Sequence, residues 1–320
     1  MNNNESENSV QTSGNDLIVK ADKKSCDREW QITRLSPGKG PSLRYGVSLP
    51  SGRTTEQMSR FLVFVNGRTE WIEKYAQLPN DLQLEKEIGF LTWDHRGQGA
   101  SGGERAFVEG YEAYADDTHR IIHKIIKKKP YLVIAHSMGG LIALQATMMG
   151  LIKPDALILS SPLFGLPNKP VPRVLARPIA HVLGRIPAAM RLSSGAGAFT
   201  KGPFEGNALT HDHDRYEFIK GTPYPLGGVK FGWLRATFDA IDFVNDPENL
   251  KKLVTPILLL TGSDERVVDP AGIQAWIQNA AAHSKAKIEF DVIHGARHEL
   301  FSETPEYYQK ALALVRQFID

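Results

Sequence analysis

Short apolar runs alternate with segments of helical spacing through most of this chain. Each run is almost entirely apolar, and the first four occupy residues 61–65, 90–93, 132–135 and 156–159. Helix-length segments stand between these runs, at residues 71–88, 111–129 and 141–149. Strands that lack polar positions are buried on both faces, as in parallel sheets that are covered by helices on both sides. The pattern therefore predicts an α/β fold around a mostly parallel sheet.

The alternation fails between residues 163 and 244 and then returns. This segment carries many of the chain's Pro and Gly residues together with short helical pieces. Beyond it, the pattern predicts strands at 256–262 and 287–293 and helices at 271–283 and 304–319. An insertion at this place predicts a cap over the carboxyl ends of the strands, where open α/β sheets bind ligands. We expect a cap at 163–244 and a main domain formed by 21–162 and 245–320.

The N-terminal segment does not share this pattern. Residues 1–16 are rich in Asn, Ser and Glu and contain almost no apolar residues, so they predict neither a signal peptide nor a membrane-spanning helix. We expect a disordered tail over residues 1–20. Two short strands are predicted next, at 29–35 and 42–49, as an antiparallel hairpin at the edge of the sheet.

Composition and charge narrow the class of protein. An apolar fraction of 42% in 320 residues is ample for a buried core. The net charge of +2 is spread along the chain, which gives no indication of nucleic acid as a partner. Cys26 is the only Cys, so an internal disulfide is excluded, and we expect a cytoplasmic protein.

The run at 132–135 leads directly into the pentapeptide Ala135-His-Ser-Met-Gly139. The pattern predicts a strand, a sharp turn at Ser137 and a helix, with small residues on either side where backbones approach closely. Ser137 would stand above the sheet at a helix N-terminus, where the N–H of Met138 can stabilise an oxyanion. This is the nucleophile elbow with Ala135 in place of the first Gly. The alternative is an ordinary strand-to-helix turn.

A nucleophilic Ser needs a general base, and the last predicted strand is followed by two candidates. In α/β-hydrolases the chain order is Ser, then acid, then His. Here His294-Gly-Ala-Arg-His298 follows the strand at 287–293. His294 lies at the strand end, whereas His298 lies in the loop beyond Gly295. We therefore expect His298 to be the base.

The carboxylate that orients the base is expected after the strand at 256–262. Asp264, Glu265 and Asp269 all lie in the loop that follows this strand. The third position after the strand-ending Gly is the usual one in this fold, and Glu265 occupies it. Asp264 is the reserve candidate. A solvated acidic turn is the alternative interpretation of all three residues.

Three further features complete the candidate site. The second oxyanion donor is expected in the loop after 61–65, at the backbone N–H of Arg68. The segment 94–101 is interpreted as structural, because its glycines permit a tight turn in which Asp94 can accept backbone N–H bonds. The sequence His211-Asp-His-Asp214 is not expected to bind a metal, because adjacent residues of one short segment cannot converge on an ion.

Four motifs together identify a protein family more specifically than the elbow alone does. They are Asn66-Gly-Arg-x-Glu70, Asp94-His-Arg-Gly-Gln-Gly-x-Ser101, His136-Ser-Met-Gly-Gly140 and Gly295-Ala-Arg-His298. With them, the chain resembles the monoacylglycerol lipase and lysophospholipase group of α/β-hydrolases, and within it the bacterial lysophospholipase L2 type. The likeness runs from residue 61 to the C-terminus and includes the cap.

The resemblance implies hydrolysis of a single-chain acyl ester, a lysophospholipid or a monoacylglycerol, through an acyl-enzyme on Ser137. It implies no metal and no organic cofactor, and it places Glu at the position of the acid. Two departures concern the site. The group commonly has His where Asn66 stands, and Ala135 replaces the usual Gly.

Two other functions stay open. A peptidase of the same fold would need a cap carboxylate to hold a substrate amine, and Glu205, Asp212 and Glu217 are candidates. A catalytically inactive hydrolase fold used as a binding module is disfavoured, because candidates for nucleophile, base and acid are all present. Ser137 excludes dehalogenase and epoxide hydrolase chemistry, which needs a carboxylate at the elbow.

An amphipathic stretch lies inside the predicted cap. Apolar and Arg residues recur between 172 and 191: Leu175, Ile179, Val182, Leu183 and Ile186, with Arg173, Arg177, Arg185 and Arg191. Such a basic stretch predicts peripheral contact with an anionic membrane, at the inner surface for a cytoplasmic protein. The alternative, which the pattern slightly favours, is that the apolar residues pack on the main domain and the Arg side chains face water.

Overall fold

The computed structural model describes residues 11–13, 16–18, 28–38, 40–167, 173–194 and 202–319. At its centre is a ten-stranded sheet with the order β1-β2-β3-β4-β6-β5-β7-β8-β9-β10. Every pair from β6 across to β10 is parallel, and the four pairs on the β1 side of β6 are antiparallel. The mostly parallel sheet that the sequence predicts is confirmed, as is the antiparallel hairpin, which is formed by β3 and β4.

The strands from β3 to β10 follow the predicted runs closely, whereas β1 and β2 were not predicted. The strands are β1 (Gln11–Ser13), β2 (Asp16–Ile18), β3 (Arg28–Leu35), β4 (Leu43–Pro50), β5 (Arg60–Val65), β6 (Ile88–Trp93), β7 (Tyr131–His136), β8 (Leu157–Ser160), β9 (Ile257–Gly262) and β10 (Ile288–Ile293). In β5, Val63 and Val65 face one core, whereas Leu62 and Phe64 face the other. Because a core lies on each side of the sheet, the central strands have no polar face.

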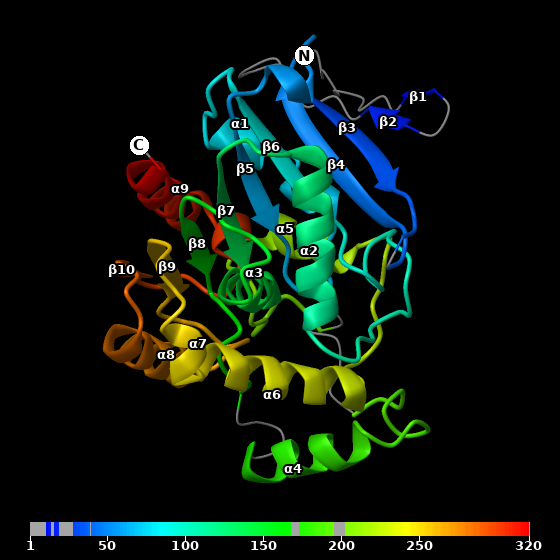
Figure 1. Ribbon diagram of the computed structural model, residues 1–320, viewed down its shortest axis with the longest axis vertical. Helices are drawn as coiled ribbons and strands as arrows, with labels where there is room; N and C mark the ends of the chain where they lie inside the picture. Colours follow the sequence, from blue (N-terminus) through cyan, green and yellow to red (C-terminus); the bar gives the residue numbers. More distant parts are fainter. Residues whose placement is uncertain are drawn as a thin grey trace.

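Helices cover both faces of this sheet (Figure 1). One face is covered by α2 (Glu112–Ile125), α3 (Met138–Met148), α6 (Phe231–Asn245) and α8 (Pro270–His283). The other is covered by η2 (Ile72–Tyr75), α1 (Leu78–Asp81), η4 (Leu300–Ser302) and α9 (Pro305–Ile319). The remaining short pieces are η1 (Thr55–Gln57) and α7 (Pro247–Leu250).

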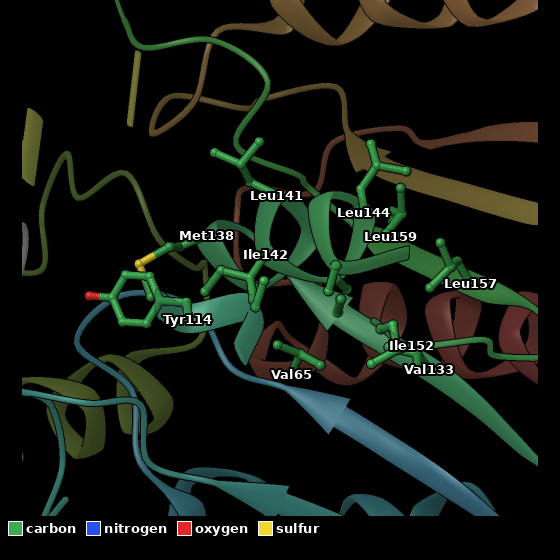
Figure 2. Packing of buried hydrophobic residues seen from close by; sticks show 14 of the residues in the cluster. Val65, Tyr114, Val133, Met138, Leu141, Ile142, Leu144, Ile152, Leu157 and Leu159 are labelled. Carbon is green, nitrogen blue, oxygen red and sulfur yellow. The ribbon is translucent and has the colours of Figure 1, made fainter. Parts of the chain in front are cut away.

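Helix α3 is buried on nearly all sides, because it lies between the sheet and the neighbouring helices α2 and α6. Figure 2 shows its apolar side chains Leu141, Ile142 and Leu144 against strand residues that include Val65, Val133, Leu157 and Leu159. A helix that is apolar all round is stable only in such a position. The Ser that precedes α3 is therefore held between two buried elements, β7 and α3.

One predicted helix is wrong. The segment 71–88 forms the short pieces η2 and α1 rather than a single helix. Pro79 stands in the first turn of α1, where its missing N–H costs nothing, and it would break a longer helix. The apolar side chains of this segment are still buried, and Tyr75 and Leu78 both lie in the second core.

Two short strands lie within the predicted tail of residues 1–20. β1 and β2 pair with each other, and Leu17 of β2 pairs with Ile32 on the outer edge of β3. An open sheet edge offers unpaired N–H and C=O groups, so it can order a segment with few apolar residues. The other residues of the predicted tail, and Cys26, lie outside the described residues.

The inserted segment contributes α4 (Arg173–Leu183), α5 (His213–Lys220) and α6. α6 has 15 residues, more than the short pieces that the sequence predicts. Four of its buried side chains belong to the core of the sheet: Trp233, Ala236, Ala240 and Val244. α4 packs on α6 and lies outside it, away from the sheet (Figure 1). The insertion is therefore anchored by α6, and α4 is its outermost helix in the described part.

Candidate active site

Ser137 stands between β7 and α3 in a strained backbone conformation. Its φ is 53° and its ψ is −117°, a region that residues other than Gly rarely adopt. Gly139 allows the turn to form, because a Cβ at this position would collide with the carbonyl oxygens of Val65 and Asn66. The predicted strand, sharp turn and helix are all present. Ala135, at the position of the usual Gly, is fully buried within this turn.

The loops after β9 and β10 bring Glu265 and His298 together. Nδ1 of His298 lies 2.8 Å from Oε2 of Glu265, and both side chains are buried. The other oxygen of Glu265, Oε1, accepts the N–H groups of Val267 at 2.7 Å and Val268 at 3.1 Å. This arrangement fixes Nδ1 as the protonated nitrogen of the neutral imidazole, which leaves the lone pair on Nε2.

Asp264, the reserve candidate, points elsewhere. Its carboxylate contacts the guanidinium groups of Arg266 at 2.8 Å and Arg297 at 3.4 Å. Asp269 caps α8 by accepting N–H bonds from its first turn. Of the three acidic residues in this loop, Glu265 is the one that the structure places on His298.

Opposing effects set the charges of this pair. Burial alone would raise the pKa of the Glu265 carboxyl, but His298 and the two backbone N–H groups outweigh it and hold this pKa below its usual value. Burial disfavours the imidazolium as well, yet Glu265, with help from Glu299 and Glu70, holds the pKa of His298 above its ordinary value. His298 is therefore a stronger base than an isolated imidazole.

In the part of the chain that the structure describes, the loop after β5 leaves the N–H of Arg68 unpaired. The neighbouring N–H groups are both used: that of Gly67 donates to the Glu70 carboxylate, and that of Thr69 donates to Oε1 of Gln98 at 2.7 Å. No acceptor for the N–H of Arg68 exists among the described residues. Such a donor can serve an oxyanion.

Met138, the other predicted oxyanion donor, begins α3, where helix N–H groups have no partner within the helix. Its Sδ lies 3.8 Å from Nε2 of Gln98, the residue that also holds the Arg68 loop. Gln98 therefore connects the two predicted donor residues. The sequence interpretation gave this Gln no role, although it stands in the motif 94–101.

The structural role predicted for the rest of that motif is confirmed. Asp94 is fully buried, and its carboxylate accepts the N–H groups of Ile72 at 3.0 Å and Ala100 at 2.8 Å. It also forms an ion pair with Arg44 at 3.1 Å. These bonds connect the turn after β6 to the start of η2, and so hold the loops on either side of the site.

A buried ionic cluster lies beneath these loops, and the sequence interpretation missed it. Nζ of Lys74 lies 2.5 Å from Oε1 of Glu70 and 2.6 Å from Oε2 of Glu299. Nε2 of His136 lies 3.4 Å from the same oxygen of Glu299. The sequence contains one indication of this cluster, since Glu70 and Lys74 are four residues apart in a stretch that is otherwise mostly apolar.

The cluster adjoins each of the loops that form the site. His136 immediately precedes Ser137, and its ring centroid lies 4.8 Å from that of His298. Glu299 immediately follows His298, and Glu70 accepts the N–H of Gly67. The cluster therefore ties together the elbow, the His loop and the oxyanion loop.

Among the described residues, this cluster also contains the group of His and acidic side chains that could converge on a metal ion. Ligand atoms of Glu70, His136 and Glu299 lie within 4.8 Å of one another. The ammonium group of Lys74 is already bound by both carboxylates, so a cation would have to displace it. We therefore interpret the cluster as an ion-pair network.

Lys74→Met is expected to lower the free energy of unfolding by about 3–5 kcal/mol, because it leaves two carboxylates buried without a cation. Urea unfolding measures the effect. Lys127→Met is a matched control, since Lys127 also pairs with a carboxylate, that of Glu56, but at the surface. The control is expected to leave the free energy of unfolding unchanged. Equal effects of the two substitutions would contradict a stabilising role for the cluster.

The other polar residues that the sequence singled out lie apart from this cluster. Nδ1 of His211 lies 2.9 Å from Glu303, and Asp212 caps α5. Glu217 pairs with Lys220 at 3.2 Å, and Glu205 is exposed. These contacts give no support to an amine-binding site in the insertion.

The elbow follows β7, the acid follows β9 and the His follows β10. This order defines an α/β-hydrolase with a serine at the nucleophile position. The structure of a soluble variant of the monoglyceride lipase of Saccharomyces cerevisiae has this fold. It superposes with a TM-score of 0.70 over 90% of this chain and 95% of that chain, at 21% identity.

The chain belongs to the family described as serine aminopeptidase, S33, whose sequence model matches residues 56–305. Lysophospholipase L2 of Escherichia coli K12 is 32% identical over 283 residues, which cover 82% of this chain and 80% of that protein. The probable lysophospholipase L2 of Haemophilus influenzae is 29% identical over 273 residues, with 82% and 84% covered. The resemblance stated from the motifs is confirmed by these relatives.

Proposed function

We propose that this protein hydrolyses the ester of a single-chain lipid, a lysophospholipid or a monoacylglycerol, through an acyl-enzyme on Ser137. The named relatives support the broader statement that the chain is a carboxylic ester hydrolase acting on lipids. One observation carries the finer proposal. His298 is held by Glu265 at 2.8 Å, and it lies against His136, which immediately precedes Ser137.

In this mechanism, Nε2 of His298 takes the proton from Oγ of Ser137 while Oγ attacks the ester carbonyl carbon. The negative charge moves to the carbonyl oxygen, where the N–H groups of Arg68 and Met138 stabilise it. The C–O bond to glycerol then breaks, and His298 returns the proton to the departing alkoxide. Water repeats the same steps on the acyl-enzyme and releases the fatty acid, which regenerates Ser137.

Glu265 acts through His298 and stays ionised throughout. Its carboxylate fixes the tautomer of the imidazole and stabilises the imidazolium that forms in each transition state. The N–H groups of Val267 and Val268 hold the other oxygen, so the carboxylate cannot rotate away. No metal and no organic cofactor takes part in this proposal.

We propose that residues 163–244 form a cap over the carboxyl ends of the strands. Two contacts support this. Nη2 of Arg68, in the loop after β5, donates to the carbonyl oxygen of Gly227 at 3.1 Å. Trp71 packs on Phe218 of α5 with ring centroids 5.5 Å apart. The insertion therefore touches the loop that carries the proposed oxyanion donor.

The experiment that tests this function compares ester and amide substrates on the purified protein. The panel contains p-nitrophenyl esters of increasing chain length, lysophosphatidylcholine, a monoacylglycerol and aminoacyl-anilides. We expect hydrolysis of the acyl esters, including at least one of the two lipids, and much slower cleavage of the anilides. A preference for the anilides would favour the peptidase, and no hydrolysis at all would favour an inactive binding module.

The apolar face of α4 is exposed and does not pack on the main domain. Val174, Leu175 and Val182 are 77%, 54% and 61% exposed. In contrast, Arg177 of the same helix is paired with Asp242 of α6. No described helix is long and apolar enough to cross a membrane. We propose that α4 rests on the surface of an anionic membrane and lets substrate enter the cap sideways.

The double substitution Leu175→Asp and Val182→Asp is expected to weaken binding to vesicles that contain anionic lipid by about 10²-fold or more. The reason is that each apolar side chain that enters the interface contributes roughly 1.5–3 kcal/mol to binding. Co-sedimentation measures the partition coefficient. Val254→Asp is the control, since Val254 is an equally exposed apolar residue, 63%, just before β9. Absence of binding by the wild type, or equal binding by the double variant, would contradict the proposal.

A further inference from the structure

The guanidinium group of Arg68 lies at the junction of the oxyanion loop and the insertion, and no carboxylate among the described residues pairs with it. Its Nη2 donates to the carbonyl oxygen of Gly227, and its Cζ lies 5.0 Å from the centre of the Trp233 ring. Its Nε is buried and has no hydrogen-bond partner among the described residues. The titratable groups that act on it are Tyr114 and Tyr111 rather than a carboxylate.

These tyrosines do not neutralise the charge. Burial raises the pKa of Tyr114 to about 12 and raises the pKa of Tyr111 further, so both hydroxyls are neutral at physiological pH. Burial lowers the pKa of Arg68, but a guanidinium keeps its proton in proteins. A cation with unused donors therefore stands beside the proposed oxyanion site.

Two other enclosed arginines have carboxylate partners, and the guanidinium of a third, Arg28, is held by Ser48 and by backbone carbonyl oxygens. Arg44 pairs with Glu73 and Asp94, and Arg96 pairs with Asp117 through both Nε and Nη2. An enclosed cation without such a partner is costly, unless an anion reaches it from outside. The planar fork of a guanidinium matches a phosphate better than any other common anion-binding side chain.

The length of the side chain fits the distance between the two ends of a lysophospholipid glycerol. About six bonds separate the backbone nitrogen of Arg68 from Cζ, and about six separate the ester carbonyl carbon from the phosphorus atom. Three bonds of an extended chain span roughly 3.5 Å, so both distances are at most about 7 Å. One residue can therefore hold the oxyanion through its N–H and the phosphate through its side chain.

We propose that the Arg68 side chain binds the phosphate of the substrate, so that the enzyme selects monoacyl glycerol esters that carry a phosphodiester over neutral monoacylglycerols. This inference rests on the proposed function, and it names which of the two lipid classes the site takes. Arg68 is then a specificity-determining residue as well as an oxyanion donor.

The test is the ratio of kcat/KM for 1-decanoyl-glycero-3-phosphocholine to kcat/KM for 1-decanoylglycerol, both kept monomeric. We expect the wild type to prefer the phosphodiester, and Arg68→Met to lower the ratio by about 10- to 100-fold, because it removes charge-assisted hydrogen bonds to phosphate. Arg68→Lys is expected to give an intermediate ratio, since Lys keeps the charge but loses the fork.

Arg105→Met is the matched control for a purely structural role. Arg105 is an exposed arginine that holds the same cap segment, through the carbonyl oxygens of Tyr224 and Pro225 at 3.2 Å. We expect this variant to keep the wild-type ratio. An equal loss in both variants would mean that Arg68 only anchors the cap, and an unchanged ratio in Arg68→Met would exclude a phosphate contact.

A second measurement uses the wild type alone and does not depend on how the variants fold. We expect the ether 1-O-decyl-glycero-3-phosphocholine, which lacks the scissile ester, to inhibit p-nitrophenyl butyrate hydrolysis at least about 10-fold more strongly than 1-O-decylglycerol. Equal inhibition would overturn the phosphate subsite while leaving the esterase intact. Failure of the wild type to hydrolyse any ester would instead overturn the proposed function, and this inference with it.

Discussion

Ser137→Ala is expected to lower kcat for ester hydrolysis by about 10⁴- to 10⁶-fold, the loss typical of a triad whose members act as a unit. The substitution removes one hydroxyl and keeps the Cβ, so the strain of the turn, with φ at 53°, is the same for Ser and Ala. We therefore expect the free energy of unfolding to change by less than about 1 kcal/mol.

Ser161→Ala is the matched control for this prediction. Ser161 is also a buried Ser with positive φ, 44°, and it follows the neighbouring strand β8. Its replacement is expected to keep activity within the same order of magnitude. Steady-state rates on one p-nitrophenyl ester and urea unfolding of all three proteins separate loss of chemistry from loss of fold. Retained activity in Ser137→Ala would remove the nucleophile from the proposal.

Glu265→Gln is expected to lower kcat/KM by about 10²-fold or more, because the amide cannot satisfy both of its neighbours. The N–H groups of Val267 and Val268 require an oxygen at the position of Oε1. The NH₂ group of the new Gln would then face Nδ1 of His298 and force its proton onto Nε2. That tautomer cannot accept the proton of a Ser.

Asp264→Asn is the control for the acid, because Asp264 is adjacent in sequence but contacts Arg266 and Arg297 instead of His298. We expect this variant to retain most of its activity. The comparison uses kcat/KM on the same ester for both variants. Equal losses, or a larger loss for Asp264→Asn, would assign the role of the acid to Asp264.

The sheet and the elbow could be predicted because their causes are local. Strands such as β5 and β7 are buried on both faces, and this requires an unbroken apolar run in the sequence. The turn at Ser137 requires small neighbours, and Gly139 shows why, since any side chain there would strike the end of β5. His298 could be proposed because the loop after the last strand opens at the same edge of the sheet as the elbow.

The local sequence pattern could not decide whether Asp264 or Glu265 is the carboxylate that orients His298. The two residues are adjacent, and a shift of one residue in a loop reverses which side chain faces the site. In the structure, Glu265 contacts His298, and its other oxygen is held by contacts that form only after the loop folds, at Val267 and Val268. From the sequence, Glu265 is favoured by counting from the end of β9 and by the resemblance, which places Glu at the position of the acid.

The ionic cluster could not be predicted, because its contacts are distant in sequence. Lys74 is 225 residues from Glu299, and nothing in a single sequence links the two. A Lys in a stretch with helical spacing is most simply placed in water, whereas this one is buried. Only the meeting of the loops after β5, β7 and β10 brings the charges together.

The sequence likewise could not show whether the apolar face of α4 points toward the protein or toward solvent. Periodicity shows that Leu175, Ile179 and Val182 lie on one face of a helix, but it does not show what that face meets. In the structure, the helix rests on α6 through other residues, such as the buried Ala180, and turns its larger apolar side chains outward.

The most direct test of a serine hydrolase centred on Ser137 is to identify the residue that becomes covalently modified. The protein is treated with a fluorophosphonate, or quenched with acid during turnover of a monoacyl ester, and its peptides are examined by mass spectrometry. The mechanism predicts that both the phosphonyl and the acyl group are found on Ser137, and that Ser137→Ala carries neither. Modification of another residue, together with an active Ser137→Ala variant, would contradict it.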